Sequence, residues 1–389
     1  MSCPLMSTRY SRREFLTKVP KGICALGIGS QLLNVSALPN IAYSLQESET
    51  EPPLKEVIYY EKLGDQRIQC KVCPKECKIA DLERGYCGNK ENRGGKYYTL
   101  VHSRPCAIHV DPIEKKPLFH YLPSTPALSL ATAGCNFECK FCQNWNIAQF
   151  RPEQVKSYHV TPEGMVGIAK RENCPTIAYT YSEPVVFYEY MYDIAELAKK
   201  QGIGSVMISN GFINKKPLVK LCEHLSAVKI DLKAFTERFY RESCSGELRP
   251  VLDTLETLRE IGIWYEIVVL IIPTLNDSEQ EIREMSLWIK NKLGPDVPIH
   301  FSRFHPAYKI RNLPPTPVRT LERARKIGRE TGLNYVYIGN VPGHEGESTY
   351  CPKCGKVPIR RVGYTMLEMN LKSGKCGYCN NPIPGVWKT

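Results

Sequence analysis

The chain has 389 residues, of which 42% are hydrophobic and 24% charged, and its formal net charge is +12. These values are typical of a globular protein of two or three domains with a sizeable buried core, and they exclude a disordered chain. No long run of lysine or arginine concentrates the charge, which favours a solvated basic surface over a nucleic-acid groove.

The N-terminal segment, residues 1–56, resembles an export leader followed by a linker. Residues typical of a twin-arginine signal are Arg12, Arg13, Phe15, Leu16 and Lys18, the last one position late. The apolar stretch that follows, about twelve residues, is too short to span a membrane. Twin-arginine transport carries folded, cofactor-loaded proteins. An uncleaved basic leader is the alternative, and the polar, proline-containing residues 44–56 predict a linker.

Seventeen cysteines are unusual for a chain of this length, and most of them fall into three tight clusters. Disulfide scaffolds are typically short and secreted, so metal binding is the better account of such spacing. The clusters are Cys70/Cys73/Cys77/Cys87, Cys135/Cys139/Cys142 and Cys351/Cys354/Cys376/Cys379. The others are predicted to be buried or incidental thiols: Cys3, Cys24, Cys106, Cys174, Cys222 and Cys244.

The first cluster has a C-x2-C-x3-C-x9-C spacing and lies in a predicted Cys-rich lobe, residues 57–125. Four thiolates there suit either a structural zinc ion or a second iron–sulfur cluster. Glycine knuckles favour small tetrahedral sites, which gives zinc a slight preference. Cys106 and His109 are near enough in sequence to be spare ligands.

Residues 126–342 alternate between short β-rich runs and helical patterns, such as 185–202 and 320–332, that end at glycine. The runs are 128–134, 176–183, 205–211, 227–233, 264–272, 299–304 and 335–339. This alternation predicts an α/β fold with a parallel sheet and right-handed crossovers, either a barrel or a doubly wound sheet. Ligands of such folds gather at the C-terminal ends of the strands.

The second cluster follows the first of these runs in a C-x3-C-x2-C spacing, with no fourth cysteine close by. Each iron of an iron–sulfur cube needs a ligand beyond the sulfides. Cys135, Cys139 and Cys142 would therefore leave one iron open for a substrate atom, just as a catalytic zinc keeps one position free. The missing ligand indicates a reactive site.

The third cluster consists of two C-x2-C pairs, Cys351/Cys354 and Cys376/Cys379, in a predicted C-terminal lobe, residues 343–389. The spacing is close to that of a zinc ribbon, and a rubredoxin-like iron site is the alternative. Zinc is favoured, as a structural ion for a small lobe with few core residues.

The loop GCNFECKFCQNWN (134–146) resembles the signature of radical SAM enzymes. From about residue 70 to 389, the chain resembles the radical SAM member of the AmmeMemoRadiSam system and, more distantly, the activating enzymes of glycyl-radical enzymes such as pyruvate formate-lyase activase. Matching stretches are DPIEKKPLFHYLP, AYTYSEP, SNGF, VKIDLKAF, IPTLNDS, SRFHPAYK, VYIGNVPG and the cysteine-rich tail.

That resemblance implies a radical SAM partial (β/α)6 barrel with a small Cys-rich N-terminal lobe and a zinc-ribbon-like C-terminal lobe. It also implies a [4Fe–4S] cluster at Cys135, Cys139 and Cys142, whose open iron chelates the amino and carboxylate groups of S-adenosylmethionine. Reduction of the cluster would cleave S-adenosylmethionine to methionine and a 5′-deoxyadenosyl radical, which abstracts hydrogen from a substrate.

The residues that the resemblance assigns to S-adenosylmethionine are Glu183, Ser209, Asn210, Asp231, Lys233 and His305. Glu183 matches the acid that binds the methionine ammonium, and Lys233 would face the methionyl carboxylate. The chain departs from the family pattern at two places. Tyr181 and Ser182 replace two glycines, and Glu266 occupies roughly the position that aligns with a cofactor-binding arginine of the activating enzymes. No catalytic residue beyond the cluster is identified.

Relationship to the activating enzymes favours a protein substrate, with the flanking metal lobes as docking surfaces. A metabolite or lipid substrate is the second interpretation. A non-catalytic iron–sulfur carrier or zinc-ribbon binder is the third, although a carrier would need four protein ligands and the ribbon offers few nucleic-acid-binding side chains. Expected partners are a flavodoxin or ferredoxin and the Memo-like and AMMECR-like proteins of the same system. The chemistry favours the cytoplasm, whereas the leader favours export.

Overall fold

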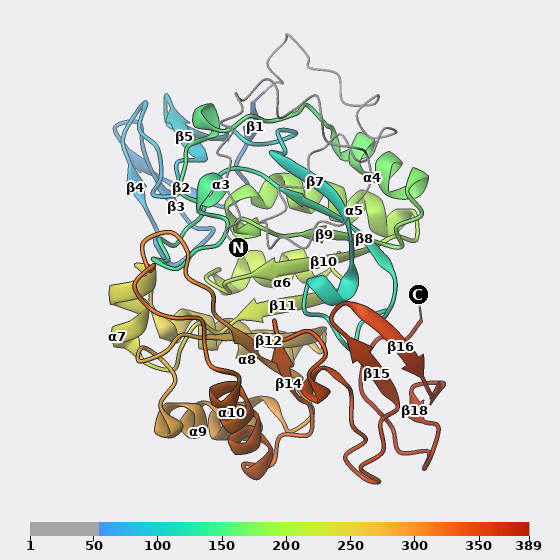
Figure 1. Ribbon diagram of the computed structural model, residues 1–389. Helices are drawn as coiled ribbons and strands as arrows, with labels where there is room; N and C mark the ends of the chain where they lie inside the picture. Colours follow the sequence, from blue (N-terminus) through green and yellow to red (C-terminus); the bar gives the residue numbers. More distant parts are fainter. Residues whose placement is uncertain (1–53, 389) are drawn as a thin grey trace, which may run out of the picture. The chain divides into compact units, whose positions relative to one another are not determined.

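The β-rich runs predicted between residues 126 and 342 form neighbouring parallel strands in the structure, a computed structural model that describes residues 54–388. They belong to an eight-stranded sheet (Figure 1) in which β7 pairs antiparallel with β8 at one edge and β14 stands at the other. In spatial order the strands are β14 (Val336–Gly339), β13 (Ile299–Arg303), β12 (Trp264–Ile271), β11 (Ala227–Asp231), β10 (Gly204–Ser209), β9 (Thr176–Tyr179), β8 (Pro126–Ala131) and β7 (Ala107–Pro112).

The parallel strands are buried on both faces, as their nearly continuous apolar sequences require. Every residue of β9 and all but the first of β8 are buried. Several predicted runs extend past the C-terminal ends of the strands, and the clearest case is 176–183, whose strand ends at Tyr179. The chain leaves the sheet there to enter the loops that carry the candidate site residues.

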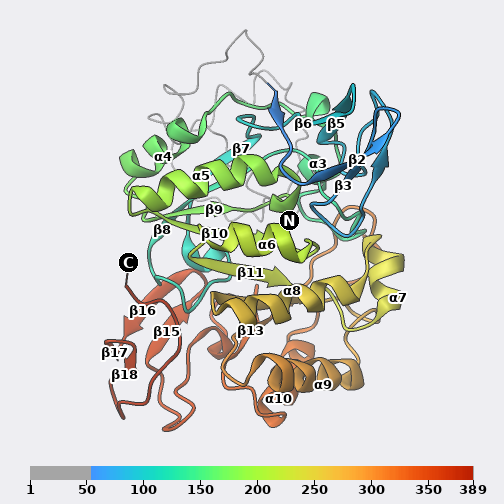
Figure 2. The same cartoon turned by 180° about the vertical axis from the view of Figure 1, so that it is seen from behind.

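Helical crossovers join the parallel strands throughout the described part of the chain. The main helices are α4 (Pro162–Arg171), α5 (Tyr188–Lys200), α6 (Lys215–Cys222), α8 (Leu248–Ile261), α9 (Glu279–Trp288) and α10 (Val318–Glu330). They lie along one face of the sheet (Figures 1 and 2), whereas a doubly wound sheet would carry helices on both faces. The predicted α/β class with a parallel sheet is confirmed, in the form of an open, partial barrel.

Short helices mark the turns between these elements. They are α3 (Trp145–Ala148), α7 (Glu237–Phe239), the 3-10 helices η2 (Ile113–Lys115), η3 (Pro152–Gln154), η4 (Pro184–Phe187) and η7 (Glu345–Glu347), and the π-helices η5 (Tyr240–Cys244) and η6 (Ile289–Leu293). No helix in residues 54–388 is long and apolar enough to cross a membrane.

The N-terminal lobe consists of two three-stranded antiparallel sheets, with the orders β1-β6-β5 and β2-β3-β4. Their strands are β1 (Lys55–Glu56), β2 (Tyr60–Gly64), β3 (Arg67–Cys70), β4 (Lys78–Ile79), β5 (Lys90–Arg93) and β6 (Lys96–Thr99). The lobe shares one apolar core with the barrel, to which Ile68 and Tyr97 contribute from the lobe and Phe187 from η4. Lys90 forms a fully buried ion pair with Glu189 of α5 at 2.8 Å, which fastens the lobe to the barrel.

The C-terminal lobe consists of two hairpins, β15 (Ile359–Val362) with β16 (Thr365–Met369) and β17 (Leu371–Lys372) with β18 (Lys375–Cys376). The backbone of Val386 bonds to both His120 and Leu122, just before β8 begins. Buried Arg361 donates to the carbonyl oxygen of Phe119 at 2.7 Å. The lobe therefore packs at the N-terminal ends of the parallel strands, opposite the end where the three-cysteine loop leaves β8.

Residues 1–53 and 389 lie outside the described residues. The twin-arginine-like motif with Arg12 and Arg13, and the thiols of Cys3 and Cys24, are among them. The predicted division at residues 56, 125 and 342 remains a prediction, since the described residues all belong to one unit.

Candidate functional site

The three-cysteine loop leaves the C-terminal end of β8, where a parallel sheet gathers its ligands. The loop is bound to its neighbours by backbone hydrogen bonds. Glu138 and Lys140 donate to the carbonyl oxygens of Cys244 and Ser243, each at 2.9 Å, so the loop pairs with the π-helix η5. Lys140 in turn accepts hydrogen bonds from the segment after β13, at Lys309 and Ile310.

The side chains of the loop fit a multi-iron cluster better than a single ion. Among the described residues, Cys135, Cys139 and Cys142 do not form a group whose ligand atoms all lie within 4.8 Å of one another, as thiolates on one metal ion would. Thiolates on three irons of one cube lie farther apart, at roughly 6 Å. The backbone N–H of Phe137 donates to the Sγ atom of Cys135 at 3.3 Å, a contact that tunes cluster potentials.

Glu183 lies at the end of β9, nine-tenths or more buried. Its carboxylate accepts hydrogen bonds from Ser209 Oγ at 2.7 Å, from the backbone N–H of Asn210 at 2.8 Å and from that of Val185 at 3.1 Å. Burial raises the pKa of Glu183 to about 7, against the effect of these donors. The structure thus brings three sequence-predicted residues, Glu183, Ser209 and Asn210, into direct contact.

Asn136, inside the cysteine loop, was not identified from the sequence. Its Oδ1 accepts from Asn210 Nδ2 at 2.8 Å, and its Nδ2 donates to the carbonyl oxygen of Phe212 at 2.9 Å. Asn136 thereby connects the cysteine loop to the end of β10 and so to Glu183. No local pattern marks such a residue, because its partners are more than seventy positions away in sequence.

Asp231 and Lys233 form an ion pair at 2.8 Å at the end of β11. Lys229, which sequence analysis missed, binds the other carboxylate oxygen of Asp231. Burial opposes ionisation of Asp231, but the two lysines outweigh it and lower its pKa to about 2. A hydrogen bond with Cys244 lowers the pKa of Cys139, and the positive charge of Lys233 acts in the same direction. Lys233 is therefore within electrostatic reach of the cysteine loop.

Tyr181, in place of a family glycine, has a left-handed backbone with φ +66. Its hydroxyl donates to Asp111, its ring lies 4.5 Å from Lys116 Nζ, and His109 packs edge-on against it. Its carbonyl oxygen accepts from Asn144 Nδ2 at 2.8 Å. These contacts stabilise a conformation that usually favours glycine, so the substitution leaves the turn before Glu183 intact.

The other two residues singled out in the sequence differ in position: one is exposed at the cysteine-loop end of the sheet, and the other lies toward the opposite end. His305 is exposed just after β13. Glu266 is fully buried in β12, where it accepts from the backbone N–H groups of Phe119 and His120 and pairs with His300 at 2.8 Å. Since those residues lie toward the N-terminal ends of the strands, Glu266 belongs to the structural contacts beneath the barrel and not to the cysteine-loop end.

The C-terminal cysteines converge on one point. Among the described residues, Cys351, Cys354, Cys376 and Cys379 are the group whose ligand atoms all lie within 4.8 Å of one another. Cys351 Sγ is 3.6 Å from Cys379 Sγ, and Cys354 Sγ is 3.9 Å from Cys376 Sγ. Tetrahedral zinc with Zn–S bonds of about 2.3 Å separates its thiolates by roughly 3.8 Å, so the four residues fit one metal ion.

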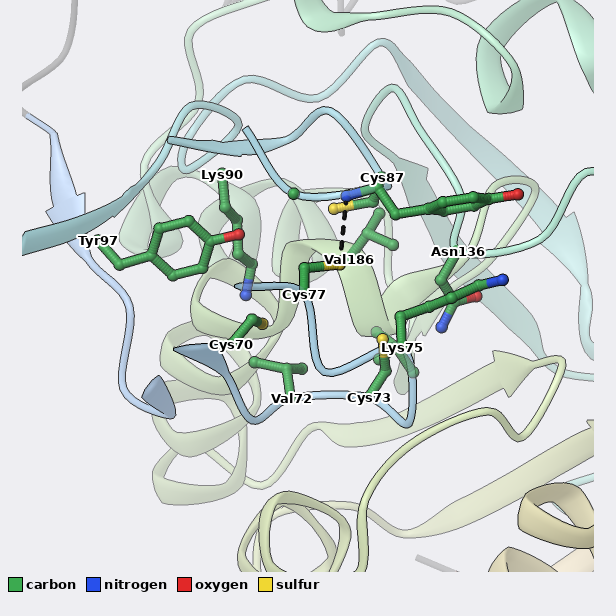
Figure 3. Close-up of a pocket in the computed structure, with 13 residues that line it drawn as sticks. Cys70, Val72, Cys73, Lys75, Cys77, Cys87, Lys90, Tyr97, Asn136 and Val186 are labelled. Atoms are coloured by element: carbon green, nitrogen blue, oxygen red, sulfur yellow. Dashed lines mark hydrogen bonds between the residues drawn. The ribbon is translucent and has the colours of Figure 1, made fainter. Parts of the chain in front are cut away.

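The N-terminal cysteines line a pocket instead (Figure 3). Cys70, Cys73, Cys77 and Cys87 surround it, together with Lys90 and Tyr97. The predicted spare ligands are not part of its lining, because Cys106 pairs with Ala131 of β8 and His109 lies against Tyr181.

The comparisons with known proteins agree with this geometry. The model of the radical SAM superfamily matches residues 129–288. An uncharacterized protein of Methanocaldococcus jannaschii is 46% identical over 332 residues, which cover 85% of this chain and 99% of that protein. The pyruvate formate-lyase-activating enzyme of Clostridium pasteurianum is 25% identical over 201 residues, 46% of this chain and 80% of that enzyme.

A solved structure of a radical SAM methyltransferase from Sphaerobacter thermophilus aligns over 58% of this chain and 71% of its own, at 14% identity and a TM-score of 0.45. The superfamily match runs from β8 to α9 and includes the three-cysteine loop, Glu183 and Lys233. The chain belongs to the radical SAM superfamily, whose enzymes use a [4Fe–4S] cluster and S-adenosylmethionine.

Proposed function

We propose that Cys135, Cys139 and Cys142 hold the [4Fe–4S] cluster of a radical SAM enzyme and that S-adenosylmethionine binds at its open iron. The observation that carries this proposal is the convergence of the three-cysteine loop, Glu183 and Lys233, which follow the C-terminal ends of β8, β9 and β11. When bound, the cluster supplies the electron that cleaves S-adenosylmethionine to methionine and a 5′-deoxyadenosyl radical, which abstracts hydrogen from a substrate.

The chain's own residues would bind the methionyl group at both ends. An ionised carboxylate has about four lone-pair positions, and three chain donors reach Glu183. The remaining position suits an N–H of the cofactor's amino group, whose nitrogen lone pair would bind the open iron. Ser209 and Asn210 hold the carboxylate in place, and Asp231 orients the Lys233 ammonium toward a ligand carboxylate. Burial of Glu183 strengthens these charged contacts because little water competes.

For the substrate we propose a protein, acted on in the manner of an activating enzyme. The similarity to a pyruvate formate-lyase-activating enzyme supports this choice. A metabolite or lipid is the second candidate. We also propose that the chain is the radical SAM member of the AmmeMemoRadiSam system, with the Memo-like and AMMECR-like proteins as partners. The stretches quoted from the sequence support that assignment.

Reductive cleavage requires a one-electron donor of low potential, for which we propose a flavodoxin or ferredoxin. Both this donor and S-adenosylmethionine are cytoplasmic supplies, so we propose a cytoplasmic location. The arginine pair in the N-terminal segment supports export as the alternative.

The test is anaerobic reconstitution with iron and sulfide, followed by reduction with dithionite in the presence of S-adenosylmethionine. The expected product is 5′-deoxyadenosine. Next, a protein fraction and a metabolite fraction of cell extract are each incubated with the reconstituted, reduced enzyme. The fraction in which a new product forms contains the substrate. A protein that releases no 5′-deoxyadenosine, although it carries a full cluster, would contradict the proposal.

A further inference from the structure

Two groups of four cysteines flank the barrel, and their geometries differ. The C-terminal group brings its sulfur atoms to within 3.6 and 3.9 Å of each other in pairs, as one tetrahedral ion requires. Among the described residues, no three of Cys70, Cys73, Cys77 and Cys87 have sulfur atoms all within 4.8 Å of one another. The two groups occur in one chain, so each serves as the reference for the other.

The N-terminal sulfur atoms surround a space instead of meeting at a point. Figure 3 shows the four cysteines pointing into one pocket from different sides. The cavity volume of that pocket is only about 20 Å³, so the spacing of the sulfur atoms and not the free space carries the comparison. Thiolates bound to four different irons of a cube are held apart at roughly 6 Å, with the sulfides and irons between them. The arrangement suits a cube and is too wide for a single ion.

The lining of the pocket suits a thiolate-bound inorganic cluster in other respects. Val72, Val185 and Val186 provide an apolar wall. The backbone N–H of Tyr86 donates to Cys77 Sγ at 3.4 Å, the dashed contact in Figure 3. Lys90, paired with Glu189, brings an ammonium group to the wall. A zinc ion with four thiolates and an oxidised cube with four thiolates both carry a net charge of about −2, so the charge of Lys90 suits either, and the spacing decides between them.

The pocket also borders the three-cysteine loop. Asn136, which follows Cys135, is part of its wall. Cys87 and Cys135 line one neighbouring surface cleft, over which Tyr86 donates to Glu138 at 2.7 Å. The two groups of cysteines are therefore adjacent in the fold although about fifty residues separate them in sequence.

From this geometry we propose that Cys70, Cys73, Cys77 and Cys87 bind a second [4Fe–4S] cluster, fully ligated by protein, beside the candidate active site. The slight preference for zinc that the glycine knuckles suggested is thereby reversed. The proposal does not depend on the proposed function, because a fully ligated cluster can form whether or not the three-cysteine loop binds S-adenosylmethionine.

The test counts metals and sulfide in the full chain, purified and reconstituted without oxygen in the presence of zinc. Wild type should contain about eight irons and eight labile sulfides per chain. Changing Cys135, Cys139 and Cys142 together to Ala should leave about four of each, with the absorption near 400 nm and an electron paramagnetic resonance signal after reduction. One zinc should remain in both proteins.

Changing Cys73 and Cys87 to Ala should remove about four irons and four sulfides from the wild-type content, whereas Cys222→Ala on α6 should remove none. The proposal would be overturned if the variant with Cys135, Cys139 and Cys142 changed to Ala contained about two zinc ions and no labile sulfide. A wild-type content of about four irons that the Cys73 and Cys87 changes leave unaltered would overturn it as well. A protein with eight irons that releases no 5′-deoxyadenosine would contradict the proposed function and leave this proposal standing.

Discussion

At the end of β9, one carboxylate carries much of the proposed cofactor contact. Glu183 is buried against Ser209, the Asn210 backbone and the Val185 backbone, and its pKa is raised to about 7 because burial disfavours its charged form. The free position of the carboxylate suits a polarised N–H donor, such as an amino group bound to the open iron. Without such a donor, the buried residue is costly to ionise.

The first prediction concerns Glu183→Gln, compared with wild type at about pH 6 and pH 8.5. Below its pKa of about 7 the carboxyl is protonated and resembles the amide, so the two proteins should bind S-adenosylmethionine with similar affinity. Above that pKa the carboxylate gains a charge-assisted hydrogen bond worth roughly 1.5–3 kcal/mol, so wild type should bind about tenfold more tightly or better. Equilibrium dialysis with reconstituted protein measures the ratio.

The control is Glu284→Gln on the exposed surface of α9, which should match wild type at both pH values. A ratio between wild type and Glu183→Gln that stays near one at pH 8.5 would mean that Glu183 does not contact the cofactor.

Residue identities reveal only part of this site. The cysteines, Glu183 and Lys233 are recognisable because each falls in a short motif at the end of a β-rich run. Asn136 and Lys229 are not, since the interactions that give them a role depend on side chains that meet only in the folded barrel. Glu266 could be placed only by the structure, which buries it under His120 and His300.

At the scale of elements, the three-cysteine loop depends on close packing against η5. Phe137 of the loop is buried, and a Cβ atom on Gly246, just after η5, would lie 2.3 Å from its ring. Glycine is required there for space, because the contact with Phe137 leaves no room for a side chain. The loop and the segment after η5 therefore fit each other as a pair.

The second prediction compares Gly246→Ala with Gly167→Ala. The new methyl group of Gly246→Ala must displace Phe137, which should cost roughly 1–3 kcal/mol of unfolding free energy and lower the iron content of the three-cysteine loop. At Gly167 on α4 the nearest atom is the end of the Arg171 side chain at 3.8 Å, so alanine should be neutral or stabilise by about 0.5–1 kcal/mol. Denaturant unfolding and iron analysis measure both effects.

Equal stability and iron content in the two glycine variants would show that the loop does not need the close contact at Gly246.

The elements themselves were largely predictable. Seven β-rich runs separated by helical patterns are a strong signal for a parallel sheet, and the structure has these strands. Strand β7 was missed because its six residues contain His109 and Asp111, whose polar side chains break the apolar pattern. The π-helix η5 was missed as well, since a single widened turn leaves no periodic signal in a stretch of five residues.

At the scale of the whole chain, the two cysteine lobes occupy opposite ends of the parallel strands. The N-terminal lobe borders the three-cysteine loop through Asn136 and Cys87. The C-terminal lobe packs through Arg361 and Val386 beneath the barrel. Both lobes were predicted from the sequence to be docking surfaces for a substrate, and the N-terminal lobe is the one that borders the three-cysteine loop. The order of segments along the chain does not reveal this arrangement, because long-range packing determines it.

The third prediction follows from that separation. Cys351→Ser should remove the ion from the C-terminal group and lower the unfolding temperature, since the binding free energy of a structural ion contributes to folding. Cys351 is buried with Phe119 and Tyr337, so loss of the ion disturbs the contact under the barrel. Affinity for S-adenosylmethionine should remain near that of wild type. Zinc analysis, thermal unfolding and equilibrium dialysis test the three expectations.

Cys222→Ala is the matched control and should retain the zinc. A Cys351→Ser protein that keeps its unfolding temperature but loses cofactor affinity would contradict the structural role of the C-terminal lobe.

The most direct test of the central claim is electron–nuclear double resonance on the reduced wild-type protein with S-adenosylmethionine labelled with ¹⁵N at its amino group. If Cys135, Cys139 and Cys142 leave one iron open, the amino nitrogen binds that iron and the spectrum shows coupling between ¹⁵N and the electron spin of the cluster. The coupling should persist in Cys222→Ala. A reduced cluster that shows no ¹⁵N coupling with saturating S-adenosylmethionine would contradict the open-iron site.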